Sequence, residues 1–388
     1  MLDVDLVRWR RALHEIPEPG FAEVETSAYL RGVLRRMGLD VEPRAGTGLM
    51  AEIAGRGRGA RVALRADMDG LPLQEETGEA FSSRHAGMMH ACGHDIHMAI
   101  LLGAARNLLA RRDFPGRIRL LFQPSGEKLP GGARALIAEG VLQGVDGVIG
   151  LHVRARDPVG VVGMRAGAVM ANADSFEISV DGRGGHESEP EPARDAVLIG
   201  SQIVVNLQQI VSRRIAPLSP VVVSVGSFQA GSAPNIMAES ARLSGTVRTF
   251  SARLQDLVAQ EITKTAAATA AMHGAVAEVA YHRGVPAVIN DAPVLAAWRQ
   301  ALDGVVRVMD TRPSMAGEDF AYYLNEVPGA FIFLGGRPDG GVHPHHSPHF
   351  RVSEACLPFG VEVMTRGARA LLEHPDVLRR ARWREGPV

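Results

Sequence analysis

The chain has 388 residues, of which 46% are hydrophobic, and its 42 lysines and arginines almost balance its 43 aspartates and glutamates. A chain of this length exceeds what one hydrophobic core usually serves, so two domains are expected. The balanced charge excludes a basic surface for nucleic acid or a membrane, and no apolar run has the ~18 residues of a membrane span. The N-terminus lacks a secretory signal pattern and only Cys92 and Cys356 carry thiols, so we expect a cytoplasmic protein without structural disulfides.

The first part of the chain alternates helical and strand patterns. Apolar residues recur at helical spacing over 24–38, and residues 48–55 and 61–67 have the pattern of strands. The glycine-rich segment 55–59 between these strands leads into a strand rather than a helix, so we expect a hairpin turn there and not a phosphate-binding loop. The alternation continues with a helix over 94–112, a strand over 116–124, a helix over 131–140 and a strand over 146–153. It predicts an α/β layer with a mixed, mostly parallel sheet.

The pattern changes near residue 174 and changes back near residue 290. Between these points we expect a strand over 175–185, a helix over 195–213, strands over 220–231 and 239–250, a helix over 254–272 and a strand over 275–282. This order predicts a compact α+β module of the ferredoxin-like kind. The sequence therefore predicts one domain made of residues 1–173 and 289–388, with a smaller domain of residues 174–288 inserted into it.

Polar residues follow three predicted strands of the first part. Asp67 and Asp69 come at the end of one strand, Glu127 follows the next, and His152 lies at the end of the third. Ligands of α/β sheets bind where strands end and loops begin. We therefore expect these side chains to share a site, although His152 alone could also be a buried core histidine.

Histidine is concentrated in two short windows, residues 85–97 and 343–349, which hold eight of the fourteen. In the first window, Cys92 and His94 flank a glycine just before the predicted helix, where both side chains can converge on one ion. A thiolate with an imidazole suits zinc, manganese, nickel or cobalt. Cys-x-His alone is a weak signal, and a helix start without any ligand role stays open. In the second window we expect His343, His345 and His349 to lie in a solvated loop.

Several motifs together resemble one enzyme family. They are RADMDGLPLQEETG, MHACGHD, LLFQPSGEKLPGGA, GLHV, GRGGH, GTVRTF, GEDFAYYL and HHSPHF, in this order over nearly the whole chain. This set is similar to that of the M20 metallopeptidases. The closest subgroup is the amidohydrolases, which include hippurate hydrolases, N-acyl-amino-acid deacylases and auxin-conjugate hydrolases.

The resemblance implies a centre of two divalent metal ions. Cys92 would bridge the two ions as a thiolate. Asp69 would orient a ligand imidazole by a hydrogen bond without binding an ion itself, and Asp67 could have a similar role. In the family, the last ligand is the histidine of an H-x-P-x-F run, which is His346 here. The remaining ligands would be His94, Glu127 and His152.

The resemblance also assigns roles to the inserted domain, which would help to close the site and form a homodimer. A histidine of the partner subunit, in the position of His186, would polarise the substrate carbonyl. Asn235 and Arg248 would hold the carboxylate of a small-molecule substrate, because a guanidinium grips a carboxylate through two hydrogen bonds. Without the resemblance, Asn235 could be a turn residue and Arg248 a solvated strand residue.

This chain departs from the family at one position. Relatives have two glutamates after the strand over 116–124, of which the first is the general base, and this chain has Gly126 there, followed by Glu127. A positioned base contributes ~10²–10⁴-fold to rate. Three explanations remain open: a weakened enzyme, a base from elsewhere such as Glu187 or Glu189, or hydrolysis of a different carbon–nitrogen bond, such as deamination.

The sequence thus predicts a metal-dependent amidohydrolase that acts on small N-acyl amino acids or related conjugates. The metal centre would activate water and, with His186, stabilise the oxyanion. A protein that binds metal and carboxylate without turnover is the contrasting hypothesis, and a purely structural metal site is the third.

Overall fold

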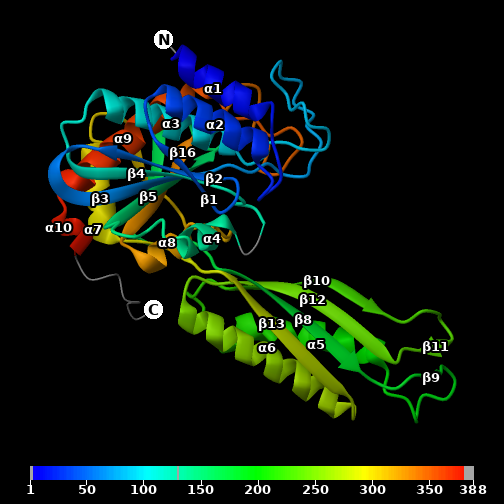
Figure 1. Cartoon of the computed structure of the whole chain (residues 1–388). Helices are drawn as coiled ribbons and strands as arrows, with labels where there is room; N and C mark the ends of the chain where they lie inside the picture. The colour runs from blue at the N-terminus through cyan, green and yellow to red at the C-terminus, as the bar shows by residue number, and fades with distance from the viewer. Residues whose placement is uncertain (1–2, 129–130, 380–388) are drawn as a thin grey trace. The chain divides into compact units, whose positions relative to one another are not determined.

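The computed structural model describes residues 3–128 and 131–379. These residues divide into two compact units (Figure 1). The large unit comprises the chain up to Val169, Val288–Pro313, and the residues from Asp319 onwards. The small unit comprises Met170–Ala287 and Ser314–Glu318. Each unit has its own hydrophobic core.

An eight-stranded mixed sheet forms the centre of the large unit. Its middle strands are parallel, and antiparallel pairs join β1 to β2, β2 to β4, and β16 to β6. In spatial order the strands are β1 (Val41–Arg44), β2 (Gly48–Ala54), β4 (Pro115–Gln123), β3 (Arg56–Asp67), β5 (Gly147–Arg154), β16 (Gly329–Gly335), β6 (Val161–Met164) and β15 (Arg307–Asp310).

Helices cover both faces of this sheet, as Figure 1 shows with α1, α3 and α9 on one face and α4 and α8 on the other. Helix α3 is buried over almost its whole length and packs against α1 and α9, which explains its continuous apolar sequence. The helices of the unit are α1 (Val4–His14), α2 (Val24–Arg36), α3 (His94–Ala110), α4 (Gly132–Ala138), α7 (Ala292–Ala301), α8 (Ala321–Glu326), α9 (Leu357–Glu373) and α10 (Asp376–Arg379). A 3-10 turn spans Glu354–Cys356, and the short strands β7 (Gly167–Met170) and β14 (Val288–Asn290) pair with each other.

The hairpin predicted at residues 55–59 is wrong. Strands β2 and β3 are not neighbours, because β4 lies between them, antiparallel to β2 and parallel to β3. The glycines instead let the chain cross closely over the start of β4. A Cβ atom on Gly55 would lie 2.1 Å from the carbonyl oxygen of Phe114, and one on Gly59 would lie 2.6 Å from the nitrogen of Gly116.

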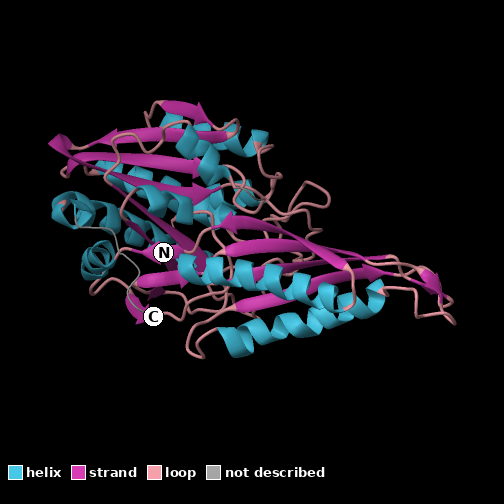
Figure 2. Ribbon diagram, turned by 90° about the horizontal axis from the view of Figure 1, so that it is seen from below, coloured by secondary structure: helices cyan, strands magenta, loops and turns pink. Residues whose placement is uncertain are grey.

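The small unit is a four-stranded antiparallel sheet with two helices on one face (Figure 2). Strand β8 alternates buried and exposed residues, so one face packs on the helices. Along the chain the elements are β8 (Ala173–Asp181), α5 (Ala196–Gln209) with a π turn (Ile210–Arg214), β10 (Val222–Ala230), β12 (Ser240–Arg248), α6 (Ala252–Met272) and β13 (Val276–Val285). The spatial order β10-β12-β8-β13 confirms the ferredoxin-like arrangement. Across the described ranges of both units, no helix combines the length and apolarity that a membrane crossing requires.

Candidate metal centre

The site lies where parallel strands β3, β4 and β5 end and helix α3 begins. His152 is the third residue from the end of β5, and His94 is the first residue of α3. The residue before the helix, Gly93, has φ +89°, a left-handed conformation that favours glycine. This tight entry brings Cys92 and His94 to the same side although they are only two residues apart.

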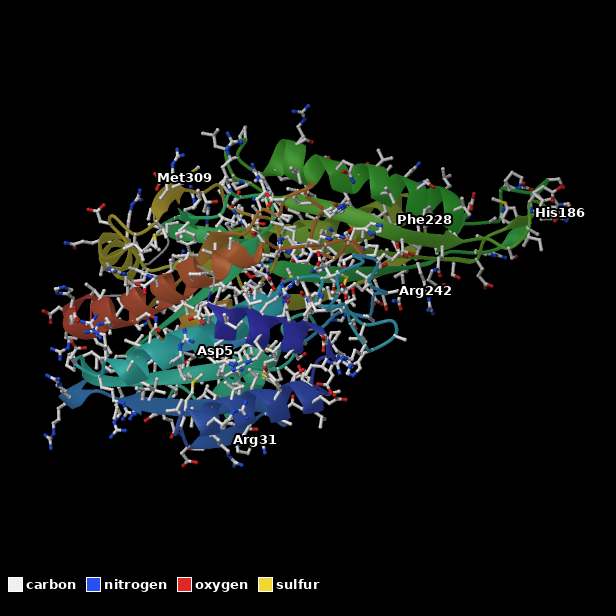
Figure 3. All side chains as sticks on the ribbon, turned by 90° about the horizontal axis from the view of Figure 1, so that it is seen from above. Asp5, Arg31, His186, Phe228, Arg242 and Met309 are labelled. Atoms are coloured by element: carbon white, nitrogen blue, oxygen red, sulfur yellow. The ribbon has the colours of Figure 1, made fainter. Side chains whose placement is uncertain are left out.

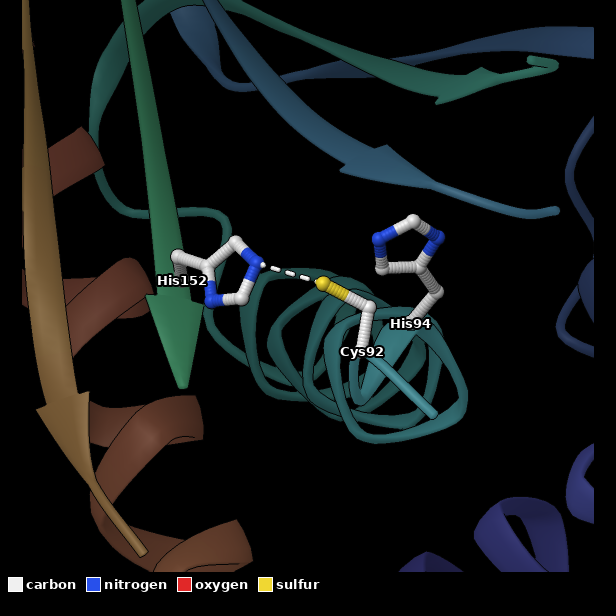
Figure 4. Close-up of side chains that lie close together, drawn as sticks. All are labelled: Cys92, His94 and His152. Carbon is white, nitrogen blue, oxygen red and sulfur yellow. Dashed lines mark hydrogen bonds between the residues drawn. The ribbon is translucent and has the colours of Figure 1, made fainter. Parts of the chain in front are cut away.

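The first group of donors consists of Cys92, His94 and His152, whose ligand atoms all lie within 4.8 Å of one another. The Sγ atom of Cys92 is 3.3 Å from Nε2 of His152 (Figure 4). Cys92 is 8% exposed and His94 2% exposed. The group is therefore largely shielded from solvent.

The second group consists of Cys92, Glu127 and His346, again within 4.8 Å. Nε2 of His346 lies 3.3 Å from Oε1 of Glu127, and Nε2 of His94 lies 3.6 Å from the same oxygen. The backbone N–H of His346 donates to the carbonyl of Ala91, which ties this late loop to the Cys92 loop. Because the two groups share only Cys92, the arrangement suits a thiolate between two ions.

Hydrogen bonds turn the imidazoles toward the sulfur. Nδ1 of His94 must donate, because it contacts the carbonyl oxygen of Asp69 at 2.9 Å and Oδ1 of the same residue at 3.2 Å. Nδ1 of His152 likewise donates to the carbonyl of Val153 at 2.7 Å. Both Nε2 lone pairs are then free for an ion, which is how ligand histidines are normally oriented.

Asp69 also organises the loop after β4. Its two carboxylate oxygens accept the backbone N–H groups of Gly126 at 2.8 Å and of Glu127 at 3.0 Å. One buried carboxylate therefore positions both a ligand imidazole and the backbone that carries the ligand carboxylate. This geometry is what the predicted orienting role of Asp69 requires.

A third group of close donors, Asp67, His94 and His97, is ruled out as a separate site by its hydrogen bonds. Nε2 of His97 accepts the backbone N–H of Val153 at 2.9 Å, so its lone pair is occupied. Its Nδ1 then donates to Oδ1 of Asp67 at 2.6 Å. His97 is a structural support that connects β3, α3 and β5.

No sequence pattern predicts the charged network next to the site. Arg65 is 2% exposed and donates to Asp67 at 2.8 Å, to Gln123 at 2.9 Å and to Asp319 at 2.8 Å. Asp319 also accepts the amide of Gln123. Arg65 belongs to the motif RADMD and Asp319 to the motif GEDF, but no local pattern indicates that the two side chains pair.

Electrostatics in the site favour an added cation. Burial raises the pKa of the Cys92 thiol well above its usual value, and the charge of Glu127 adds to this. Burial lowers the pKa of His152, so its imidazole is neutral. Although burial opposes it, the hydrogen bond from His346 lowers the pKa of Glu127 to about 2. A divalent cation would stabilise the thiolate and use the neutral imidazole of His152 and the carboxylate of Glu127, so the donor set fits the implied metal pair.

The expected solvated loop is only partly correct. His343 and His349 are exposed, whereas His345 is half-buried. The ring centroid of His345 lies 5.2 Å from that of His152 and 4.6 Å from that of Phe350. Because His346 belongs to the second donor group, this loop packs against the donors, and the adjacent His345 is half-buried as a consequence.

Gly126 lies against the donors. A Cβ atom at this position would lie 3.2 Å from Oδ1 of Asp69 and 3.5 Å from Cε1 of His94. Gly126 is absent from the residues with positive φ in the described ranges, so its backbone accepts other residues. The position for which the resemblance implies a general base therefore faces the candidate metal donors.

The residues predicted in the small unit lie at two separate ends of it. His186 is exposed and pairs in β9 (Gly185–His186) with Ile236 of β11 (Ile236–Met237), next to Asn235. Figure 3 shows His186 at one end of the unit, beyond Arg242 near the start of β12. Arg248 is the last residue of β12, about 27 Å from the first residue of that strand, Ser240. One chain alone does not bring Asn235 and Arg248 together.

Comparisons with known proteins agree with this architecture. Residues 63–370 match the model of peptidase family M20/M25/M40. The chain is 40% identical to an N-acetyl-L-cysteine deacetylase of Bacillus subtilis, over 96% of this chain and 89% of the relative. It is 43% identical to an N-acyl-L-amino acid amidohydrolase of Geobacillus stearothermophilus, over 74% and 78% of the two chains. A crystal structure of a dinuclear metal-binding M20 peptidase from Bacillus subtilis superposes with a TM-score of 0.86 at 36% identity, covering 95% of this chain and 97% of the other.

Proposed function

Because the chain belongs to peptidase family M20/M25/M40, we propose that it is a metal-dependent amidohydrolase that cleaves the amide bond of small N-acyl amino acids. The observation that carries the proposal is the pair of donor groups that share Cys92. The names of the two relatives, a deacetylase and an N-acyl-amino-acid amidohydrolase, support the substrate class. Two free cysteines are in keeping with a cytoplasmic location.

In this proposal Cys92, His94, Glu127, His152 and His346 hold two divalent ions. Zinc, manganese, nickel and cobalt all accept a set of thiolate, imidazole and carboxylate donors. When bound, the ions would polarise the acyl carbonyl and lower the pKa of water. The protein's own contribution is to keep each donor in place through Asp69, Val153 and the buried network below.

We further propose that the complete site needs a homodimer. His186 and Asn235 lie at one end of the small unit and Arg248 at the other, so a second copy is needed to bring them together. Arg248 would then hold the substrate carboxylate with Asn235 of the second copy, and His186 of that copy would donate to the developing oxyanion.

The residue that would accept the proton from water is not evident among the proposed site residues. Gly126 cannot take a proton from water, and Glu127 belongs to the donor set. Glu187 lies 3.0 Å from Nδ1 of His186 and would reach the substrate together with it. The second candidate function, a protein that binds metal and carboxylate with little turnover, is favoured by Gly126 alone.

Turnover assays separate these two functions. The protein is reconstituted with Mn²⁺ or Zn²⁺ and tested for release of free amino acid from N-acetyl, N-butyryl and N-benzoyl derivatives of several amino acids. Metal-dependent hydrolysis above that of a Cys92→Ser variant supports the enzyme. Binding of N-acyl amino acids by calorimetry without product formation would support the binding protein and refute hydrolysis.

A further inference from the structure

One buried arginine close to the candidate metal donors has no acidic partner among residues 3–128 and 131–379. The buried arginines of the described chain are Arg10, Arg65, Arg119 and Arg154. Arg10 pairs with Asp95 and Glu354, Arg119 with Glu52, and Arg65 with Asp67 and Asp319; these acids account for the charge of all three. Arg154 is 7% exposed and forms no ion pair with any residue that the structure describes.

The contacts of Arg154 leave most of its donors unused. Nη1 donates to the hydroxyl of Thr311 at 2.9 Å, and the guanidinium carbon lies 3.1 Å above the ring centroid of Phe333. A guanidinium has five N–H donors, and burying its charge without a counterion is costly. A buried arginine is almost always paired, so we infer that the missing partner is an anion that none of the described residues supplies.

Arg154 and the metal donor His152 project from the same face of the sheet. They are two residues apart on β5, and alternate residues of a strand share a face, about 6.6 Å apart. Phe333 of β16 is the direct cross-strand partner of His152. Because the guanidinium lies over the Phe333 ring, it folds back toward His152 and not away from it.

The neighbouring strand has a glycine on this face, where a side chain would be crowded. The next strand after β16 is β6, and it carries Gly163 beside Phe333. A Cβ atom on Gly163 would lie 3.2 Å from Cβ of Thr311 and 3.6 Å from Cβ of Phe333. Because residue 163 is a glycine, β6 places no side chain beside Phe333 and Thr311, next to the guanidinium.

Other charges near Arg154 are also positive on balance. Asp157 is an acid whose charge acts on Arg154, and its carboxylate lies 3.9 Å from Nε of Arg156. The guanidinium of Arg337 donates to the carbonyl of Arg156 and brings a further positive charge. An incoming anion would therefore meet an electropositive surface at this end of β5.

We propose that Arg154 binds a carboxylate carried by the acyl group of the substrate, so that the enzyme prefers dicarboxylic acyl groups such as succinyl or glutaryl. This inference rests on the proposed amidohydrolase function, since the acyl carbonyl must lie at the metal donors for a terminal carboxylate to reach Arg154. In that function the carboxylate of the amino acid is already assigned to Arg248. Arg154 then recognises the other end of the molecule.

The test compares N-succinyl amino acids with the neutral, isosteric N-succinamyl amino acids. The wild-type protein should favour the succinyl substrate in kcat/KM, and Arg154→Met should lower the succinyl-to-succinamyl ratio by about 10- to 100-fold, the effect of a lost hydrogen bond to a charged group. Arg154→Lys should recover part of the ratio. Arg156→Met is the matched control, because the side chain of Arg156 is 68% exposed, and it should leave the ratio unchanged.

A second measurement does not need turnover. Calorimetry with succinate and glutarate on the Mn²⁺-reconstituted protein should show binding that weakens about 10-fold or more in Arg154→Met, with butyrate as the neutral-ended comparison. The Tm of Arg154→Met should stay the same or rise, because the variant removes an unpaired buried charge. A variant that loses stability and keeps the wild-type ratio and succinate affinity would make Arg154 a structural residue and overturn the inference. If no N-acyl amino acid is hydrolysed by any protein, the proposed function fails, and the calorimetry alone decides whether Arg154 binds the carboxylate.

Discussion

Replacing Gly126 by glutamate should increase activity. The backbone at this position is not left-handed in the described chain, and the added Cβ would make its nearest contacts at 3.2 Å, with Cβ of Asp67 and Oδ1 of Asp69. These contacts are tight but require shifts of only a few tenths of an ångström, so we expect a stability loss of about 1–2 kcal/mol. The new carboxylate would lie beside two buried acids, whose charge raises the pKa of a neighbouring carboxyl group toward the range of a general base.

The expected gain follows from the value of a positioned base. If the metal donors are intact and only the proton acceptor is missing, Gly126→Glu should raise kcat by ~10²-fold or more, which lowers the barrier by about 2.7 kcal/mol. The assay is release of free amino acid from N-acyl amino acids by Mn²⁺-reconstituted protein. Gly126→Gln is the control with the same shape and no base, and Gly126→Ala tests the steric cost alone. Equal rates for the glutamate and glutamine variants, with the bound metal unchanged, would refute the reasoning and direct attention to Glu187.

Three further predictions follow from other parts of the chain. Gly93→Ala should lower stability by about 1–2 kcal/mol, seen as a lower Tm, because φ is +89° there and a Cβ would lie 2.5 Å from a valine methyl; an unchanged Tm would contradict this. Although burial opposes it, His14 lowers the pKa of Glu75 to about 2 from 4.5, so this stabilisation is complete above pH 4.5 and is lost as the pH falls toward 2. Glu75→Gln should therefore flatten the acid limb of a Tm-against-pH curve, and a curve parallel to the wild type would argue against the pair. If His186 acts across a dimer, refolding His186→Ala and Arg248→Ala chains together should restore about a quarter of wild-type activity. Half of the dimers are then mixed, and each mixed dimer has one intact site. No restoration would place both residues in one subunit's site.

Local sequence patterns were sufficient for the main elements between residues 24 and 282. The apolar periods and turn residues predicted the central helices and strands of the large unit in this range and the order that makes the small unit ferredoxin-like, but they predicted no individual element after residue 290, where α7, β16 and α9 lie. They did not predict which strands become neighbours. Segment 55–59 resembles a hairpin turn locally, and only the insertion of β4, formed from residues 115–123, shows that the chain crosses over instead.

The candidate donors were predicted by a combination of local pattern and family resemblance. Cys92 and His94 are marked by a glycine before a helix, whereas His346 could be chosen only through the family's H-x-P-x-F run. The pairing of Arg65 with Asp319 joins residues 254 positions apart, and no local pattern carries that information. Nor could the sequence predict that Arg154 has no acidic partner among the described residues, because this depends on where the fold places the acids.

The central claim is that Cys92 joins two ion sites, and the metal content of the purified protein tests it most directly. Protein reconstituted with Zn²⁺ or Mn²⁺ and passed through a desalting column is analysed for ions per chain, next to Cys92→Ser and a Cys356→Ser control whose buried thiol is outside both donor groups. We predict about two ions per chain for the wild type and the control, and a loss of at least one ion in Cys92→Ser. A serine variant that retains both ions, or a wild-type protein that retains none, would contradict the account.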